Sequence, residues 1–443
     1  MKRFILEQST DEMYTDCSGL ALVGLCINRY SNLSGTVART TENSHNLIPD
    51  TDLLRSYLGL LCTGKSDYEA VTSLREDVFF KEALGIGQVP SAETLRQRFD
   101  RDADRLRGVA QNCSITLLKK ADIPITPLDT GHIPLDIDVF PMDNSGTKKE
   151  HVGRTYKGYD GYAPIAAYLG MEGWCIETEL RPGTQHSQKD FIPYLERVIN
   201  QARILTGKKL LIRLDSAHDA VDNLADLRYR AKVSSIIKWN PRKEETDALC
   251  QRAFTEGKVK EVRKGKRIAL LKTRKRRDYG GRHRYFTRVI RVIERTIDKH
   301  GQMLLVPDIR IEGWWTDLNL SSEKIISLYE NHGLSEQFHS EFKTDLDLER
   351  LPSGKFATNA LVMTLGVFSY NIMRMLGQLG LLDKDAPVRH PVKRRRIKTV
   401  LQELIHVAAR VIRNRNRFKL RFSCYCPVYP AFFALYNRLS SVF

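Results

Sequence analysis

The sequence contains no apolar run that is long enough to cross a membrane without interruption. Its longest apolar stretch, residues 356–382, is broken by polar side chains such as Arg374 and Gln378, which is typical of a buried amphipathic helix. The N-terminal stretch carries Lys2 and Arg3, but its apolar segment is too short for a secretory signal. We therefore expect no membrane association.

Cysteines in a metal-binding or disulfide-forming pattern are also lacking. The chain has eight cysteines, and they are scattered along it. Cys424 and Cys426 stand close together, but no second pair and no histidine cluster follows at the spacing of zinc ligands. The pattern favours reduced thiols in a cytoplasmic protein over disulfides or a zinc site.

Acidic residues are too few to balance the basic ones. The chain has 70 Lys and Arg against 53 Asp and Glu, which gives a formal net charge of +17 and a pI near 9.5. Nucleic acid is the commonest partner of so basic a protein, and a basic surface kept for solubility is the alternative. With 443 residues, 42% of them hydrophobic, the chain is expected to form two or three globular units.

Residues 1–125 have the patterns of helices and are interpreted as a helical N-terminal domain that binds DNA ends. Ser91 follows a proline and begins a helical pattern as an N-cap residue. That helix carries Arg96 and Arg98. They indicate either a DNA-binding face or a packing helix with a solvated basic side, and the sequence leaves both open.

The next part of the chain has an α/β pattern. Residues 133–140 alternate apolar and acidic side chains, which predicts a strand with one face in the core. Two more strands are expected over residues 161–170 and 174–180, and a helix over residues 187–205. Residues 209–215 form a nearly continuous apolar run, which is typical of a buried parallel strand.

The later segments divide by charge and by β-forming residues. Two β-forming runs flank Gly280-Gly281, which predicts a hairpin within a basic insertion. Residues 390–421, which open with Lys393, Arg394, Arg395 and Arg396, are interpreted as a basic helix. The predicted units after the N-terminal domain are an α/β core (126–237), a basic β-rich insertion (238–318), a second part of the core (319–385) and a basic helical C-terminal region (386–443).

Three carboxylates are candidates for one site. Asp138 ends the first core strand, with Asp136 as its reserve, and Asp215 ends the buried strand. The carboxyl ends of strands are where sites gather in open α/β sheets. Glu336 follows the basic insertion. Two hard divalent ions, held by such carboxylates, stabilise the attacking and leaving oxygens of a phosphodiester. Taken singly, Asp136, Asp138 and Asp215 could each cap a turn or a loop.

The segment around Glu336 adds a spacing pattern. Tyr329, His332, Glu336 and Lys343 follow one another, and Glu336 and Lys343 lie two helical turns apart on the same face. On that face the carboxylate of Glu336 would bind a metal ion and the ammonium of Lys343 would bind a DNA phosphate. An ordinary exposed Glu/Lys pair is the alternative.

This spacing resembles the Y-R-E-K signature of insertion-sequence transposases of DDE domain group 1, with His332 where the family usually has Arg. The segments around Asp138 and Asp215 resemble its first two motifs. The resemblance implies an RNase H-like core, a mixed sheet of five strands flanked by helices, with the β-rich insertion after the second aspartate strand. It also implies that Trp315 stacks on a displaced base. Core packing is the alternative for that tryptophan.

As a member of this family, the chain would cleave the ends of an insertion sequence and transfer them into target DNA. Asp138, Asp215 and Glu336 would hold two Mg²⁺ ions, for which Mn²⁺ would substitute. Tyr329, His332 and Lys343 would position the terminal phosphates. The basic insertion and residues 390–421, with Lys393, Arg394, Arg395 and Arg396, would hold the DNA backbone. The expected partners are the terminal inverted repeats, target DNA and a second copy of the chain. The expected location is the prokaryotic cytoplasm at the nucleoid. The alternatives are an RNase H-fold nuclease that does not join DNA and a catalytically decayed DNA-binding regulator.

Overall fold

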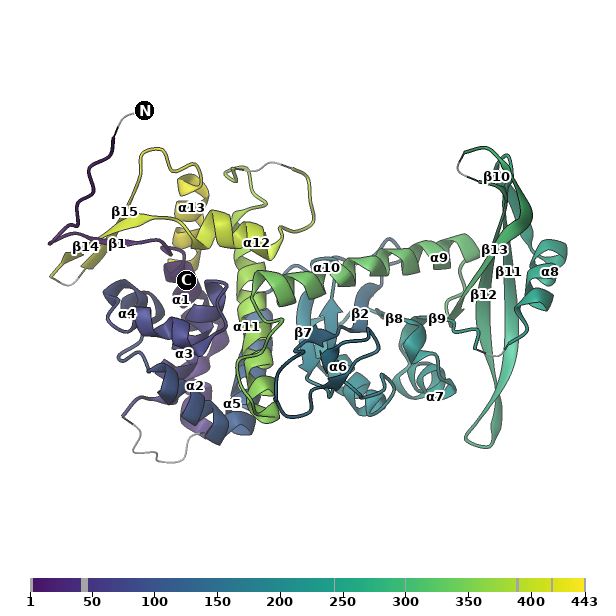
Figure 1. The fold of residues 1–443 in the computed structure, drawn as a ribbon, viewed down its shortest axis with the longest axis horizontal. Helices are drawn as coiled ribbons and strands as arrows, with labels where there is room; N and C mark the ends of the chain where they lie inside the picture. Colours follow the sequence, from purple (N-terminus) through teal and green to yellow (C-terminus); the bar gives the residue numbers. More distant parts are fainter. Residues whose placement is uncertain are drawn as a thin grey trace.

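A computed structural model describes residues 3–441 apart from 41–46, 243, 299, 388–389 and 416. Lys2, considered above, lies outside the described residues. The molecule is elongated (Figure 1). Helices from the two ends of the chain form one end, a mixed sheet lies in the middle, and long strands form the other end.

The central sheet contains five strands that carry the candidate carboxylates. Their bounds are β2 (Ile133–Val139), β6 (Ile165–Leu169), β7 (Trp174–Glu179), β8 (Leu210–Leu214) and β9 (Ser234–Lys238). They lie in the order β7-β6-β2-β8-β9, in which β2, β8 and β9 are parallel and β6 and β7 antiparallel. This confirms the predicted α/β class and its mixed sheet flanked by helices.

Helices cover the sheet on both sides. The helix α6 (Phe191–Leu205) packs against β7, and so does α11 (Phe356–Gly380), which also contacts the N-terminal helices. All five residues of β8 are buried, as expected for a parallel strand that is covered on both faces. α11 is long and apolar enough to span a membrane, but its most apolar stretch is entirely buried inside the protein. The helix is therefore part of the core.

The basic insertion extends the same sheet. Its strands are β10 (Lys258–Arg263), β11 (Lys266–Tyr279), β12 (Arg282–Ile297) and β13 (Met303–Thr316), and α8 (Thr246–Glu256) precedes them. β13 pairs with β9 and so joins the insertion to the core. Between β11 and β12, Gly280 and Gly281 have φ angles of 57° and 70°. Two positive φ angles are what a two-residue hairpin turn requires, as predicted.

The N-terminal residues are mainly helical, as predicted, but they share their core with the rest of the chain. A continuous cluster of buried residues runs from Leu20 through the sheet to Leu439. Ser91 caps the longest N-terminal helix through a hydrogen bond from Thr94 N to its Oγ. The helices of this part are α1 (Leu20–Cys26), α2 (Leu33–Thr40), α3 (Asp50–Cys62), α4 (Val78–Leu84) and α5 (Ala92–Lys120).

The C-terminal region corrects one expectation. Residues 390–421 are not one basic helix, because the short helix α12 (Ile397–Val400) leads into a hairpin of β14 (Ala409–Asn414) and β15 (Arg417–Phe422). The side chains of β14 alternate between buried and partly exposed, which is the two-residue period of a strand. The N-terminal strand β1 (Met13–Thr15) pairs with the other edge of β14.

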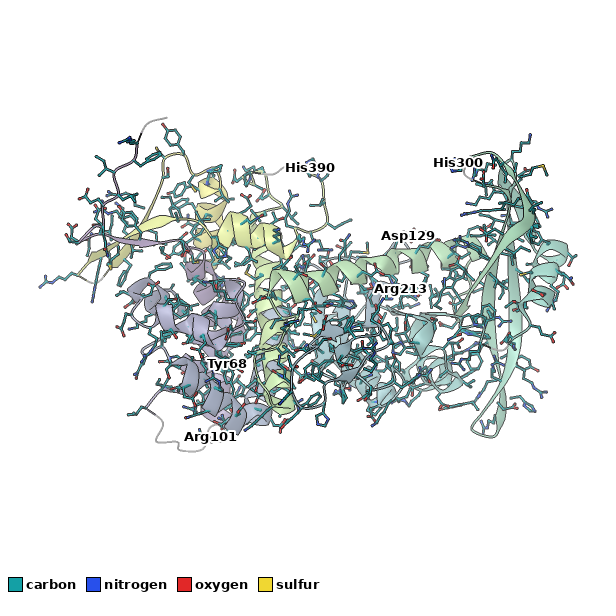
Figure 2. All side chains as sticks on the ribbon, in the orientation of Figure 1. Tyr68, Arg101, Asp129, Arg213, His300 and His390 are labelled. Carbon is teal, nitrogen blue, oxygen red and sulfur yellow. The ribbon has the colours of Figure 1, made fainter. Side chains whose placement is uncertain are left out.

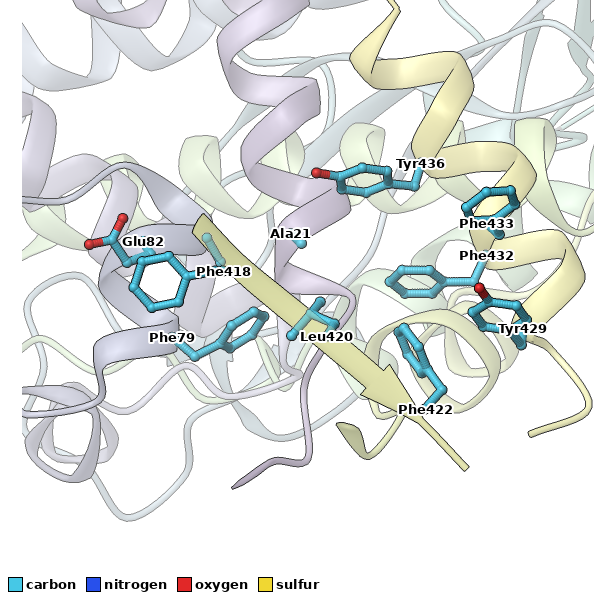
Figure 3. A pocket seen from close by; sticks show the side chains of 11 residues that line it. Ala21, Phe79, Glu82, Phe418, Leu420, Phe422, Tyr429, Phe432, Phe433 and Tyr436 are labelled. Carbon is cyan, nitrogen blue, oxygen red and sulfur yellow. The ribbon is translucent and has the colours of Figure 1, made fainter. Parts of the chain in front are cut away.

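An apolar pocket of about 350 Å³ opens between α1, α4, β15 and the last helix, α13 (Tyr429–Ser440) (Figure 3). Aromatic side chains such as Phe422 and Phe432 line it. It belongs to the end of the molecule where the two chain termini meet, while β2 and β8 lie in the middle (Figure 1). This pocket is therefore separate from the candidate carboxylates.

A buried ion pair fixes the core helix α11. Arg374, which is 1% exposed, pairs with buried Glu341 and donates hydrogen bonds to Tyr370 Oη (2.7 Å) and to the carbonyl oxygen of Arg395 (2.6 Å). Arg394 also pairs with Glu341. Removing one partner of a buried pair leaves the other charge without compensation.

We therefore expect Arg374→Ala to lower the free energy of unfolding by about 3–5 kcal/mol, measured by urea denaturation. Arg252→Ala is the matched control, because Arg252 pairs with Glu256 on an exposed helix surface. That variant should change the stability by less than about 0.5 kcal/mol. Equal effects of the two substitutions would contradict this account of α11.

Candidate active site

Strand pairing brings the first two candidate carboxylates together. In the parallel pair of β2 and β8, Ile137 lies opposite Leu214. Asp138 and Asp215 are the next residues along these two strands, so the backbone places them side by side at the carboxyl ends. Burial and the nearby charge of Asp215 raise the pKa of Asp138 to about 7. The two carboxylates are thus close enough to repel each other.

Asp215 ionises more readily than its neighbour. Its Oδ1 accepts a 2.7 Å hydrogen bond from Nδ1 of His218, which is fully buried. Burial alone would raise the pKa of Asp215, but this hydrogen bond and the charge of His218 hold the pKa below its ordinary value. The two strand-end carboxylates therefore differ in protonation near neutral pH.

Glu336 belongs to a different element from the two aspartates. It lies on α10 (Leu334–Ser340), a short helix that packs against β2. Its side chain is exposed, and its negative charge contributes to the raised pKa of Asp138. Glu336, which is far from Asp138 in the chain, is therefore within electrostatic range of Asp138, which lies beside Asp215.

The donor set suits hard divalent ions. Three carboxylates offer only oxygen ligands, which Mg²⁺ prefers, and their repulsion around Asp138 is what a cation would relieve. Their oxygens do not crowd around a single point. Among the described residues, the one group of donors that all lie within 4.8 Å is elsewhere, at Asp16, Cys17 and His406. Carboxylates that are spaced more widely can hold two metal ions, which stand roughly 3.5–4 Å apart in enzymes that use two metals.

Asp136, the reserve candidate, has a different role. It is 2% exposed, and Arg213 donates to both of its oxygens at 2.6 and 2.7 Å. His332 donates to Oδ1 from Nδ1 at 2.9 Å. Burial would raise the pKa of Asp136, but these two cations lower it. Its oxygens are committed to a buried network (Arg213 is labelled in the middle of Figure 2), which leaves Asp138 as the better metal ligand.

His332 does not lie where a phosphate contact was expected. Its side chain is 7% exposed and faces Asp136 inside the protein. Burial lowers the pKa of His332, but the charge and hydrogen bond of Asp136 outweigh burial and leave the pKa raised. The histidine therefore serves the buried network of Asp136 and Arg213. We correct the expected direct contact with DNA to this indirect role.

Tyr329 and Lys343 lie at the edge of the same site. Tyr329 is half-buried, and burial together with the charges of Asp215 and Asp138 raises the pKa of its hydroxyl. Lys343 Nζ lies 2.9 Å from Glu349 Oε2 and donates to the carbonyl oxygen of Pro141 at 2.9 Å. Tyr329 is therefore within electrostatic range of both aspartates.

Trp315 is a packing residue in this structure. It lies on β13 and is 1% exposed, and the guanidinium of Arg288 stacks over its ring at 5.0 Å. A nucleobase has no access to a ring that is covered in this way. Core packing, the alternative considered from the sequence, therefore replaces the expected base stacking.

The basic run that opens the C-terminal region is largely tied to the site helix. Arg394 pairs with Glu341 and donates to Gln337 Oε1 at 2.8 Å, and Arg396 pairs with Asp345 at 2.9 Å. Arg395 donates from Nε to the carbonyl oxygen of Leu381 at 3.0 Å. Lys393 is exposed. Arg394 and Arg396 therefore fasten the C-terminal region to the helix of Glu336 and the turn after it, and Arg395 fastens it to the residue that follows α11.

Two histidines near the carboxylates were not foreseen from the sequence. His218 supports Asp215, as described above. His339 stacks on Phe140 with ring centroids 4.5 Å apart, and its Nδ1 lies 3.9 Å from Asp138 Oδ2. Burial lowers the pKa of His339 to about 3, so it is neutral. Histidines at the i+3 position of both Asp215 and Glu336 were the available signal.

Comparison with known proteins identifies the family of this chain. The model of the transposase DDE domain group 1 family matches residues 26–442, so the chain belongs to that family and is a transposase. Among solved structures, the chain is similar to a piggyBac transposase synaptic complex with hairpin DNA. The identity is 10% over 89% of this chain and 82% of that chain, with a TM-score of 0.39. No curated protein matches the chain.

The raised pKa of Asp138 predicts a pH dependence of stability without divalent ions. Its pKa is about 7 in the folded state and 3.8 in the unfolded chain, so the folded state binds more protons between these values. Stability should therefore fall as pH rises through this window. We expect Asp138→Asn to reduce the loss between about pH 5 and about pH 8 by roughly 2–4 kcal/mol, measured by urea denaturation in EDTA.

Proposed function

We propose that this transposase cleaves DNA at the ends of a mobile element and joins those ends to target DNA in one site. The observation that carries the proposal is that Asp138 and Asp215 lie side by side at the carboxyl ends of two parallel strands, with the charge of Glu336 on α10 acting on Asp138. The three carboxylates would hold two Mg²⁺ ions, with Mn²⁺ able to replace them. When bound, such ions stabilise the charge on the attacking and leaving oxygens of a phosphodiester.

The reaction divides into two displacements at phosphorus. In the first, water attacks the phosphodiester at the element end, the bond to the 3′ oxygen breaks, and that oxygen leaves as a 3′ hydroxyl. In the second, this hydroxyl attacks a target phosphodiester and a target 3′ oxygen leaves. His218 orients Asp215 through its hydrogen bond. Lys343 and Tyr329 would hold the phosphates beside the reacting group.

DNA binding is proposed for the exposed face of the insertion. Lys272, Arg274 and Arg276 are exposed at alternate positions of β11, so they share one face. Tyr285, which is 49% exposed, lies opposite Arg276 in the register of β11 and β12. Basic side chains beside an aromatic ring suit a nucleic-acid backbone and its bases.

Recognition of the element ends is proposed for the N-terminal helices, but not through the arginines first considered. Arg98 pairs with buried Asp50, and Arg96 pairs with Glu69 and Glu93. Arg39 on α2 is exposed and is a better candidate. A dimer that holds two ends together, working at the prokaryotic nucleoid, belongs to the same proposal.

The catalytic part is tested with labelled element ends, a target plasmid and Mg²⁺. We expect Asp138→Asn, Asp215→Asn and Glu336→Gln each to lower cleavage and strand transfer by at least about 10²-fold. The same variants should weaken Mn²⁺ binding, measured by electron paramagnetic resonance. Glu256→Gln, an exposed helix position, is the control and should retain both properties.

The alternatives give different outcomes in this assay. A nuclease that does not join DNA would cut the ends in Mg²⁺ and yield no strand-transfer product. A decayed regulator would bind the ends, and Asp215→Asn would leave all of its properties unchanged. Either result would overturn the proposed function.

DNA binding is tested by its dependence on salt. Replacing Arg274 and Arg276 together by Gln should reduce the slope of log K against log salt by about 2 and lower affinity for any duplex. Arg252→Gln, on exposed α8, is the matched control. In the same titrations, Arg39→Gln should weaken binding to the element end more than to a scrambled duplex. Unchanged slopes, or an Arg39 effect without sequence preference, would refute the respective assignment.

A further inference from the structure

The two ends of the chain meet in a rigid junction at the side of the molecule away from the insertion (Figure 1). Beyond β1, Ser18 N donates to Val407 O and Gly19 N donates to Ile405 O, each at 3.2 Å. A Cβ atom on Gly19 would lie 2.0 Å from Leu404 O, so only glycine permits this approach. The backbone on both sides of the junction is therefore fixed.

Three possible metal ligands converge at this junction. Donor atoms of Asp16, Cys17 and His406 all lie within 4.8 Å of one another. The Sγ of Cys17 is 3.4 Å from Nδ1 of His406. In a tetrahedral zinc site, with bonds of about 2.3 Å to sulfur and 2.0–2.1 Å to nitrogen, these atoms stand about 3.5 Å apart. The pair already has the spacing that a shared zinc ion needs.

The orientation of His406 also suits a ligand. Its Nε2 lies 3.2 Å from the carbonyl oxygen of Thr63. A carbonyl oxygen only accepts hydrogen bonds, so Nε2 carries the hydrogen and Nδ1 presents its lone pair to Cys17. Histidines that bind zinc usually donate their other ring N–H to a carbonyl or carboxylate in this way, which fixes the tautomer and the ring.

We propose that Asp16, Cys17 and His406 bind one Zn²⁺ ion, with water as a further ligand, and that the ion fastens the N-terminal strand to the C-terminal hairpin. Asp16 and His406 are exposed and Cys17 is partly buried, so an ion reaches the site from solvent. The site shares no residue with the carboxylates of Asp138, Asp215 and Glu336. Its role is therefore structural and independent of the proposed phosphoryl transfer.

The binding step balances without any other reactant. Without metal, the Cys17 thiol is hydrogen-bonded to Nδ1 of His406. On binding, the S–H bond breaks, its proton passes to solvent, and sulfur and Nδ1 both bond to Zn²⁺. No oxidation is involved.

The first test uses Co²⁺ as a spectroscopic probe of the full-length protein, with excess Mg²⁺ present for the carboxylates. A thiolate ligand gives a sulfur-to-metal charge-transfer band that carboxylates do not give. We expect this band in the unmodified protein and in Cys424→Ser, which removes an exposed thiol. We expect its loss in Cys17→Ser and His406→Gln. No band in the unmodified protein, or a band that survives in Cys17→Ser, overturns the proposal.

The second test needs no variant, so it does not depend on a variant's folding. Alkylation of Cys17 is followed by mass spectrometry, with exposed Cys424 as the internal reference. Zn²⁺ should slow alkylation of Cys17 relative to Cys424 by at least about tenfold, and EDTA should reverse the effect. An unchanged ratio would mean that Cys17 and His406 form only a hydrogen bond, and the proposal would fail.

Discussion

The repulsion between Asp138 and Asp215 is the constraint around which this site is organised. Parallel pairing of β2 and β8 places these two carboxylates next to each other. The pKa values of the two carboxylates are shifted in opposite directions, which reduces their repulsion. Asp215 is stabilised as an anion by His218, whereas Asp138 keeps its proton to about pH 7. Buried Arg213 and His332 satisfy the neighbouring Asp136.

The third carboxylate depends on a second set of contacts. Glu336 is on a short helix, and a helix of seven residues has little stability of its own. That helix and the turn after it are held by ion pairs of Glu341 with Arg374 and Arg394, and of Asp345 with Arg396. Part of the basic C-terminal run thus positions the helix of Glu336, which explains why Arg394 and Arg396 lie so close to acidic partners.

The sequence predicted the features that depend on local pattern. The buried parallel strand ending at Asp215, the Gly280-Gly281 hairpin and the cap at Ser91 were all visible as periodicity or turn chemistry. Membership of the transposase family followed from the spacing of Tyr329, Glu336 and Lys343 and is confirmed. The placing of Asp138 beside Asp215 follows from the pairing of their strands, and the shared site and catalytic roles of Asp138, Asp215 and Glu336 stay predictions.

The features that the sequence did not predict depend on tertiary partners. His332 was expected to contact a phosphate. Its hydrogen bond to Asp136 joins residues 196 positions apart in the chain, so the sequence did not reveal it. Arg213 lies inside an otherwise apolar strand. A buried arginine needs an acidic partner, so Arg213 could have predicted that an acid such as Asp136 is buried beside it. Trp315 was misassigned because burial is not visible in a short motif. The zinc ligands Cys17 and His406 are 389 positions apart, so no spacing rule relates them.

The most direct measurement of the central claim is a crystal structure of the protein with Mn²⁺, located by anomalous scattering. The account predicts two peaks among the carboxylates of Asp138, Asp215 and Glu336, roughly 3.5–4 Å apart, with Asp136 still bound to Arg213. Peaks that are absent from these three carboxylates, or an ion bound by Asp136 after its release from Arg213, would contradict it.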